Sequence, residues 1–212
     1  MSGSVCNDGD GSDCIDCSPP TFFGLNIFFL PDCRDSFVSE DTCCNNFANV
    51  KDFSSIMVNL LDDFNSEKDF SVVQFATNAQ LVSNLSSAEQ TDRVIESLDY
   101  TGGFTNHASA IQTCQQTFPS RGSSGRKNFI MLVTDGVPSE PEFDPEGAAE
   151  AAASLAKSQG TVIIPVFISP YNDFSALSFM RRLSSDGKVF DVTDFDSLDS
   201  LQDSLIEQVS CS

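Results

Sequence analysis

The chain has 212 residues, of which 40% are hydrophobic and 19 are phenylalanine, a composition typical of a globular protein with a full core. Its formal net charge of −20 disfavours nucleic acid and anionic membranes as partners, because both are bound through Lys and Arg. A cation or a basic partner is the natural counterpart. No apolar run approaches the roughly 18 residues that span a bilayer, so we expect no direct membrane insertion.

Residues 1–20 are rich in Asp, Gly, Ser and Cys, and we expect a disulfide-tied tail or the end of a preceding module there, ahead of a single domain over 21–212. Residues 25–30 follow as an apolar run without alternation, which is typical of a strand buried on both faces. The run stops at Pro31, and an acidic loop with Asp32 and Ser36 comes next. In an open α/β sheet, ligands bind beyond the carboxyl ends of the strands, so Asp32 is a candidate ligand contact. Alternatively, Asp32 and Ser36 only form a turn and cap the next helix.

The remaining elements alternate between strands and helices, which predicts an α/β fold with a mostly parallel sheet covered by helices on both faces. The tight connection between the second and third strands favours an antiparallel pair. In chain order after the first strand, we predict an amphipathic helix from Asp41 to about Asn65, strands at 70–76 and 80–83, helices at 88–98 and 107–117, a strand at 128–134, a helix at 146–157, a strand at 161–168, a helix at 174–183, a strand at 189–192 and a helix at 197–209.

Cysteine usage indicates an extracellular protein. The number of cysteines, eight, is even, and no zinc pattern accompanies them: Cys14 and Cys17 form one CxxC without a second pair, and the chain has a single histidine. Disulfide bonds are therefore the favoured interpretation. The glycosylation acceptor sequence Asn84-Leu85-Ser86 is consistent with secretion, and the Met-Ser-Gly-Ser start suggests a domain trimmed from a larger secreted protein.

Three loops carry hard oxygen ligands: Asp32 with Ser36, Thr105 after two glycines, and Asp135 after the strand at 128–134. Such oxygens, meeting at the carboxyl edge of a sheet, suit a magnesium-like ion, which keeps several waters and binds one or two carboxylates directly. An incomplete coordination shell leaves room for a carboxylate of a partner.

The order of these motifs resembles the von Willebrand factor A-type domain, the integrin I-like fold, over residues 24–210. The resemblance rests on a strand followed by Asp-x-x-x-Ser, then Gly-Gly-Phe-Thr at 102–105, then Leu-Val-Thr-Asp-Gly at 132–136. It implies a doubly wound, Rossmann-like fold with a six-stranded sheet, one antiparallel edge strand and a metal-ion-dependent adhesion site (MIDAS) that takes Mg, Mn or Ca. The residues that it implies are the metal ligands Asp32, Ser36, Thr105 and Asp135, and the ligand-binding residues Arg34, Phe104, Asn106 and Gly136.

Arg34 replaces the middle serine of the family's first loop, so the site is degenerate. Either Arg34 turns outward and a weakened metal site survives, or it pairs with Asp135 or Asp32 and substitutes for the metal. We also hypothesise a disulfide between Cys33 in this loop and Cys43 or Cys44, which would stiffen the site, and one between Cys211 and an N-terminal cysteine.

The sequence therefore predicts a non-enzymatic, extracellular adhesion module that recognises a protein or matrix ligand through its top-face loops, with or without an ion. The alternative is a structural or assembly domain of a matrix or cell-surface protein with an inactive metal site. A metal-assisted hydrolase is disfavoured because no nucleophile–base pair is evident. We expect the single histidine, His107, to be a capping or surface residue.

Overall fold

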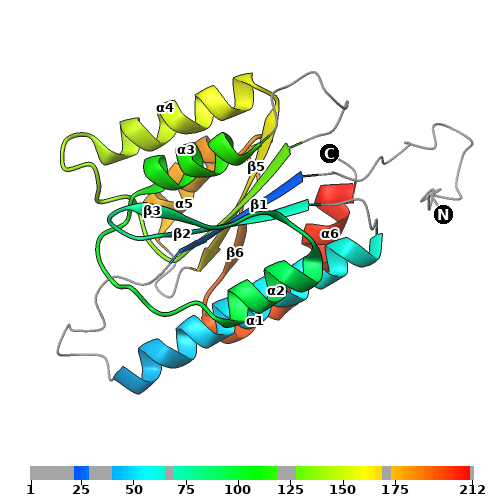
Figure 1. Cartoon of the computed structure of the whole chain (residues 1–212). Coiled ribbons are helices and arrows are strands. Elements are labelled where there is room, and N and C mark those ends of the chain that lie inside the picture. The colour runs from blue at the N-terminus through cyan, green and yellow to red at the C-terminus, as the bar shows by residue number, and fades with distance from the viewer. Residues whose placement is uncertain (1–21, 29–39, 65–68, 119–127, 169–172, 211–212) are drawn as a thin grey trace, which may run out of the picture.

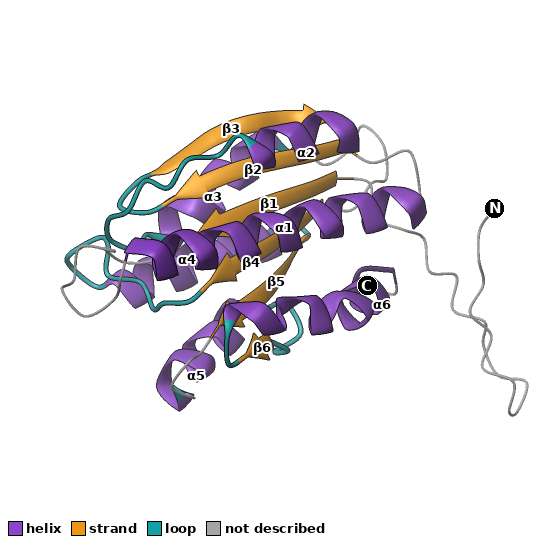
Figure 2. Cartoon of the chain, turned by 90° about the horizontal axis from the view of Figure 1, so that it is seen from below, coloured by secondary structure: helices purple, strands orange, loops and turns teal. Residues whose placement is uncertain are grey.

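Six strands form one sheet in the order β3-β2-β1-β4-β5-β6. The computed structural model describes residues 22–28, 40–64, 69–118, 128–168 and 173–210. Neighbouring strands run parallel except for β2 and β3, which are antiparallel. Figure 2 shows β3 and β6 at the two outer edges of the sheet. The strands are β1 (Phe22–Phe28), β2 (Asp69–Phe75), β3 (Ala79–Ser86), β4 (Asn128–Thr134), β5 (Thr161–Ile168) and β6 (Phe190–Val192).

Helices cover both faces of the sheet, which confirms the predicted doubly wound α/β architecture (Figure 1). Helices α1, α2 and α6 lie on one face, and α3, α4 and α5 lie on the other. None of the described helices is long and apolar enough to cross a membrane. Their bounds are α1 (Glu40–Phe64), α2 (Ala88–Glu96), α3 (His107–Thr117), α4 (Pro145–Ser158), α5 (Phe174–Leu183) and α6 (Gln202–Ser210).

The end of the chain differs from the single helix predicted at 197–209. A 3-10 helix, η1 (Phe195–Leu201), precedes α6, and the side chain of Asp194 caps it by accepting a hydrogen bond from the Ser197 backbone amide. Phe195 and Leu198 are both buried, and their spacing of three residues places them on one side of a helix with three residues per turn. Short 3-10 segments are frequent at the N-termini of α-helices, and the burial of Phe195 and Leu198 holds this one against the core.

The limits of two strands also differ from the prediction. Strand β1 begins at Phe22, three residues before the predicted start, and residues 29 and 30 lie outside the described residues. Strand β3 continues to Ser86, where the sequence predicted its end at Ser83. The predicted tail at 1–20 also lies outside the described residues.

Strand β4 divides its side chains between two cores, one on each face of the sheet. Phe129, Met131 and Val133 face the core under α1, α2 and α6, whereas Ile130 and Leu132 face the core under α3, α4 and α5. Because both sides are buried, the strand is apolar from Phe129 to Val133 and shows no alternation in the sequence.

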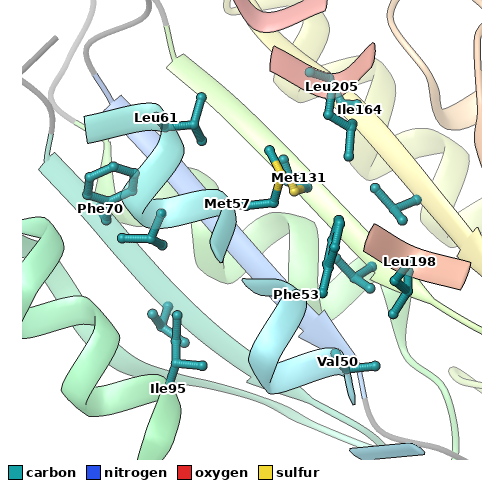
Figure 3. Packing of buried hydrophobic residues seen from close by; sticks show 14 of the residues in the cluster. Val50, Phe53, Met57, Leu61, Phe70, Ile95, Met131, Ile164, Leu198 and Leu205 are labelled. Atoms are coloured by element: carbon teal, nitrogen blue, oxygen red, sulfur yellow. The ribbon is translucent and has the colours of Figure 1, made fainter. Parts of the chain in front are cut away.

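Helix α1 supplies much of the first core. Figure 3 shows its side chains Val50, Phe53, Met57 and Leu61 on the sheet, with Met57 next to Met131 of β4. Phe53 and Met57 are fully buried. Their spacing of three and four residues is the amphipathic pattern that predicted this helix.

One of the eight cysteines is a free thiol. Cys114 lies fully buried in α3, and burial raises the pKa of its thiol, so it is a core side chain and not part of a disulfide. The predicted pairings of Cys33 and Cys211 concern residues outside the described ones, and the side chains of Cys43 and Cys44 also lie outside the description.

Candidate ligand-binding rim

Two loops meet at one end of the molecule, and we call them together the rim: the loop at 99–106, which leads into α3, and the loop at 135–144, which joins β4 to α4. Figure 1 shows both at the same end of the sheet. Three hydrogen bonds join them: the Thr105 amide donates to Ser139 Oγ (3.0 Å), and the amides of Ser139 and Glu140 donate to the Thr105 carbonyl (2.9 and 3.1 Å). Residues 34 positions apart in the chain are thereby held side by side.

The two glycines of the first loop let it turn tightly past the end of β2. Gly102 and Gly103 have φ values of +61° and +115°, which L-residues with a side chain rarely adopt. A Cβ on Gly103 would lie 2.8 Å from Thr77 Oγ1. The next residue, Phe104, donates its amide to the same hydroxyl (3.0 Å). The turn at Gly102 and Gly103 thus places Thr105 beside the second loop of the rim.

Thr105 lies beside the residues that follow β4. Its side chain is 3% exposed, and a Cβ built on Gly136 would lie 3.6 Å from Thr105 Oγ1. The structure therefore brings Thr105 next to the segment Asp135–Gly136, two of the three positions at which the sequence predicted hard oxygen ligands.

Asp135 has a buried carboxylate oxygen. The residue as a whole is half-buried, but its Oδ1 atom is inaccessible and has no hydrogen-bond partner among the residues that the structure describes. Burial raises the pKa of Asp135 to about 7, against a smaller opposite effect of a backbone hydrogen bond. A buried polar atom without a partner is uncommon in a native structure, and an ion or another ligand is one explanation for it.

His107 corrects the prediction of a capping or surface histidine. It is the first residue of α3 and is fully buried, with its ring between Phe75 and Phe179 (ring centroids 5.7 and 5.8 Å apart). Burial lowers the pKa of its imidazole to about 3, so the ring is neutral at physiological pH. His107 Nε2 lies 3.2 Å from the hydroxyl of Thr134, the last residue of β4. The histidine thus attaches the start of α3 to the strand end that carries Asp135.

The sequence held a signal for this burial. His107 lies four residues before Ile111 and seven before Cys114, both fully buried, so it belongs to the apolar stripe of α3. The hydrogen bonds of Thr134 and Ser139 had no such signal, because their partners are distant in the chain.

Asn106 caps α3. Its Oδ1 accepts the Ser109 amide (2.9 Å), and its Nδ2 donates to the Thr77 carbonyl (3.1 Å). The side-chain amide is therefore engaged within the protein, and the contact of Asn106 with a ligand stays a prediction.

Large apolar side chains are exposed around the rim. Phe104 and Val137 are 60% and 41% exposed, and Phe143, further along the second loop, is 86% exposed. Phe174, which begins α5 after the carboxyl end of β5, is 81% exposed. Exposed apolar side chains gathered in one region commonly mark a binding surface.

The remaining predicted site residues, Asp32, Arg34 and Ser36, lie outside the described residues. Within the described part of the chain, no group of three His, Cys, Asp or Glu side chains is placed to hold a metal ion. The donors that the rim does present, the Thr105 hydroxyl and the Asp135 carboxylate, are hard oxygens of the kind preferred by Mg²⁺ and Ca²⁺. Together with the partnerless Asp135 Oδ1, they fit a cation.

Comparison with known proteins agrees with this architecture. The von Willebrand factor type A domain matches residues 26–204. The collagen alpha-1(VI) chain of Xenopus laevis is 26% identical over 199 residues, covering 87% of this chain and 19% of its own length. Integrin alpha-2 of Bos taurus is 29% identical over 138 residues, covering 58% of this chain and 12% of its own. The chain thus spans less than a fifth of either relative.

Among solved structures, proximal thread matrix protein 1 from the mussel byssus, with a zinc-occupied MIDAS motif, superposes with a TM-score of 0.73. It is 20% identical, and the match covers 92% of this chain and 47% of that one. At this identity the likeness concerns the fold alone.

Proposed function

We propose that this chain, which belongs to the von Willebrand factor type A domain family, is a non-enzymatic extracellular module that binds a protein or matrix ligand through its rim. One observation carries the proposal: the buried Asp135 Oδ1 has no partner among the described residues, and the two loops of the rim carry the exposed apolar side chains Phe104, Val137 and Phe143. An unmet carboxylate beside an exposed apolar surface suits a site that a ligand completes.

A divalent cation is the first candidate for a ligand that binds the Asp135 carboxylate. Thr105 and Asp135 would hold it, with Asp32 and Ser36 as the further ligands that the family resemblance implies. When bound, Mg²⁺, Mn²⁺ or Ca²⁺ would supply positive charge and an open position for a carboxylate of the partner. Alternatively, the guanidinium of Arg34 pairs with Asp135 and takes the place of the cation.

The residues around Asp135 contribute positioning. The Thr105 amide and carbonyl fasten the two loops together, and His107 holds the end of β4 through Thr134. These contacts hold the loop that carries Asp135, but none of them is a hydrogen bond or ion pair with its carboxylate. Phe104 and Phe143 are then free to pack on an apolar part of the ligand, next to the charged contact.

Binding to a panel of purified extracellular matrix proteins, immobilised on a sensor surface, tests the proposal. We expect Phe143→Ser and Phe174→Ser to weaken binding at least tenfold. The matched control is Leu155→Ser, because Leu155 is also exposed, at 56%, but lies in the second half of α4, away from the rim. Equal losses in all three variants, or no binding to any of the matrix proteins, would contradict a rim-directed module and favour the structural or assembly role.

Calorimetric titration with Mg²⁺ and Mn²⁺ separates the two candidates for the partner of Asp135. A binding heat that disappears in Asp135→Ala supports the cation, and loss of ligand binding in EDTA should then accompany it. The absence of any heat in the wild type supports the Arg34 pair.

A further inference from the structure

The outer strand β3 carries a glycosylation acceptor sequence, which lies outside the two loops of the rim. Asn84-Leu85-Ser86 has the Asn-x-Ser pattern, and no other asparagine of the chain is followed at the second position by Ser or Thr. Asn84 is exposed. Because an N-linked oligosaccharide needs an asparagine at the surface, its position in the fold meets the first requirement.

The backbone at Asn84 departs from regular pairing with β2. Phe70 lies opposite Ser86 and Val72 opposite Ser83, so Asn84 and Leu85 together face the single residue Ser71. Leu85 has a φ of +44°, and its amide donates to Ser71 Oγ (3.0 Å) in place of a backbone carbonyl. This is a β-bulge, which interrupts the ladder at the acceptor residue.

The amide of Asn84 is also uncommitted. No hydrogen bond joins its side chain to any part of the chain that the structure describes, in contrast to Asn106, whose amide caps α3. Substitution at Asn84 Nδ2 would therefore break no contact of the fold.

One edge of strand β3 is not paired with another strand of the described sheet, because β3 is the outermost strand. Its eight residues include no charge and no proline, although the chain carries a net charge of −20. Leu81 in the same strand is 38% exposed. Edge strands can pair with another chain, and natural proteins protect them with charges, proline, β-bulges or a covering group. In β3 the bulge interrupts the ladder at Asn84, but the stretch from Ala79 to Ser83 carries no charge or proline.

We propose that Asn84 carries an N-linked oligosaccharide, which covers the outer edge of β3 and prevents pairing between copies of the chain. The proposal rests on the extracellular location in the proposed function. In the transfer, Asn84 Nδ2 forms a bond to the anomeric carbon of an oligosaccharide linked to a lipid pyrophosphate. The bond from that carbon to the pyrophosphate oxygen breaks, the lipid pyrophosphate leaves, and Nδ2 gives up one of its two protons.

The test is expression of the full chain through the secretory pathway of a eukaryotic host, followed by mass measurement before and after treatment with peptide N-glycosidase. We expect one oligosaccharide on the secreted chain, and its enzymatic removal should convert Asn84 to Asp. Asn84→Gln and Ser86→Ala should lose the modification, whereas Ser86→Thr should keep it. A secreted, folded chain without a glycan at Asn84 would overturn the proposal.

The covering role has its own readout. Size-exclusion chromatography should show a monomer for the glycosylated chain and larger species for Asn84→Gln, and Leu81→Lys added to that variant should restore the monomer. A monomeric Asn84→Gln variant would overturn the covering role. Ligand binding at the rim should be equal in Asn84→Gln and the wild type, so failure here is distinguishable from failure of the proposed function.

Discussion

Asp135 and Asp186 lie at opposite ends of the sheet, and their carboxylates have opposite surroundings. Asp186, in the loop between α5 and β6, accepts hydrogen bonds from Ser184 Oγ (3.0 Å), the Lys188 amide (2.9 Å) and Gln208 Nε2 (2.9 Å). Partial burial alone would raise the pKa of Asp186, but the hydrogen bonds from the Lys188 amide and Ser184, together with the charge of Lys188, outweigh it and lower the pKa. Asp135 has a buried oxygen without a partner among the described residues, and its pKa is raised to about 7.

The difference separates a structural carboxylate from a candidate functional one. Asp186 ties the loop before β6 to α6, and its charge is fully met within the protein. Asp135 Oδ1 has no partner among the described residues, so a bound ion or ligand could interact with its charge. Burial alone does not mark a functional carboxylate; the absence of compensating partners does.

Asp135→Asn should change the stability of the protein most, because the buried carboxylate of Asp135 destabilises the folded state when it is ionised. Because its folded pKa of about 7 exceeds the ordinary 3.8, its folded state is most favourable below pH 3.8, and stability is lost as the pH rises toward and through 7. In chelator at pH 8, Asp135→Asn should therefore raise the free energy of unfolding by about 1–4 kcal/mol. Urea unfolding of both proteins between pH 4 and 8 measures this. A less stable variant would contradict an unmet charge and support pairing with Arg34.

His107 should give the opposite pH dependence at the same end of the sheet. Its folded pKa of about 3 lies below the ordinary 6.5, so its contribution to stability is complete above pH 6.5 and is lost as the pH falls toward 3. Between pH 7 and 5 the wild type should lose roughly 2 kcal/mol through this group. His107→Gln, which keeps an amide donor for Thr134, should lack that loss. Identical pH dependence in urea unfolding would show that the ring is not buried as described.

Two glycines of the rim should respond differently to alanine. Gly103→Ala places a Cβ 2.8 Å from Thr77 Oγ1 at a φ of +115°, and it should destabilise the protein by about 1–3 kcal/mol. The matched variant Gly136→Ala meets only Thr105 Oγ1, at 3.6 Å, and its effect should stay within about 0.5 kcal/mol. Thermal unfolding compares the two. An equal loss in both variants would argue against the loop geometry.

The smallest change in stability is expected for Asp186, whose carboxylate accepts three hydrogen bonds within the protein. Asp186→Asn keeps an oxygen acceptor but loses the charge, and because the side chain is 41% exposed, we expect a loss of only about 0.5–1 kcal/mol at pH 7. Since the folded pKa of Asp186 is lowered, this contribution is present above pH 3.8 and disappears as the pH falls below it. If Asp186→Asn were more stable than the wild type in the same urea assay, Asp186 would behave like Asp135, and the proposed difference between the two carboxylates would be wrong.

Much of the fold was predictable because the relevant signals are local. The bounds of β4, β5, α3 and α5 agree with the predictions, since apolar runs and helical spacing are properties of neighbouring residues. The start of α2 also has a local cause, because Ser87 and Gln90 form a capping box there. The split of the last helix was missed because helical spacing and three-residue spacing overlap over a short segment.

The candidate site was predictable in outline but not in its interactions. That Asp135 lies at the carboxyl edge of the sheet follows from its place directly after a parallel strand, and the family resemblance implies Thr105 at the same edge. The hydrogen bonds from Thr105 to Ser139 and from His107 to Thr134 did not follow, because each joins distant parts of the chain.

The order of strands and helices and the Gly-Gly turn that leads to Thr105 could be read from the amino-acid sequence because they depend on residues adjacent in the chain, and the acidic charge follows from composition. Packing between distant parts of the chain set the surroundings of the two carboxylates: Asp135 keeps a buried Oδ1 without a partner among the described residues, whereas Asp186 accepts several hydrogen bonds. The physical reason is that hydrogen bonding and desolvation depend on which distant groups the packed core brings within contact. Chain neighbours do not specify those groups.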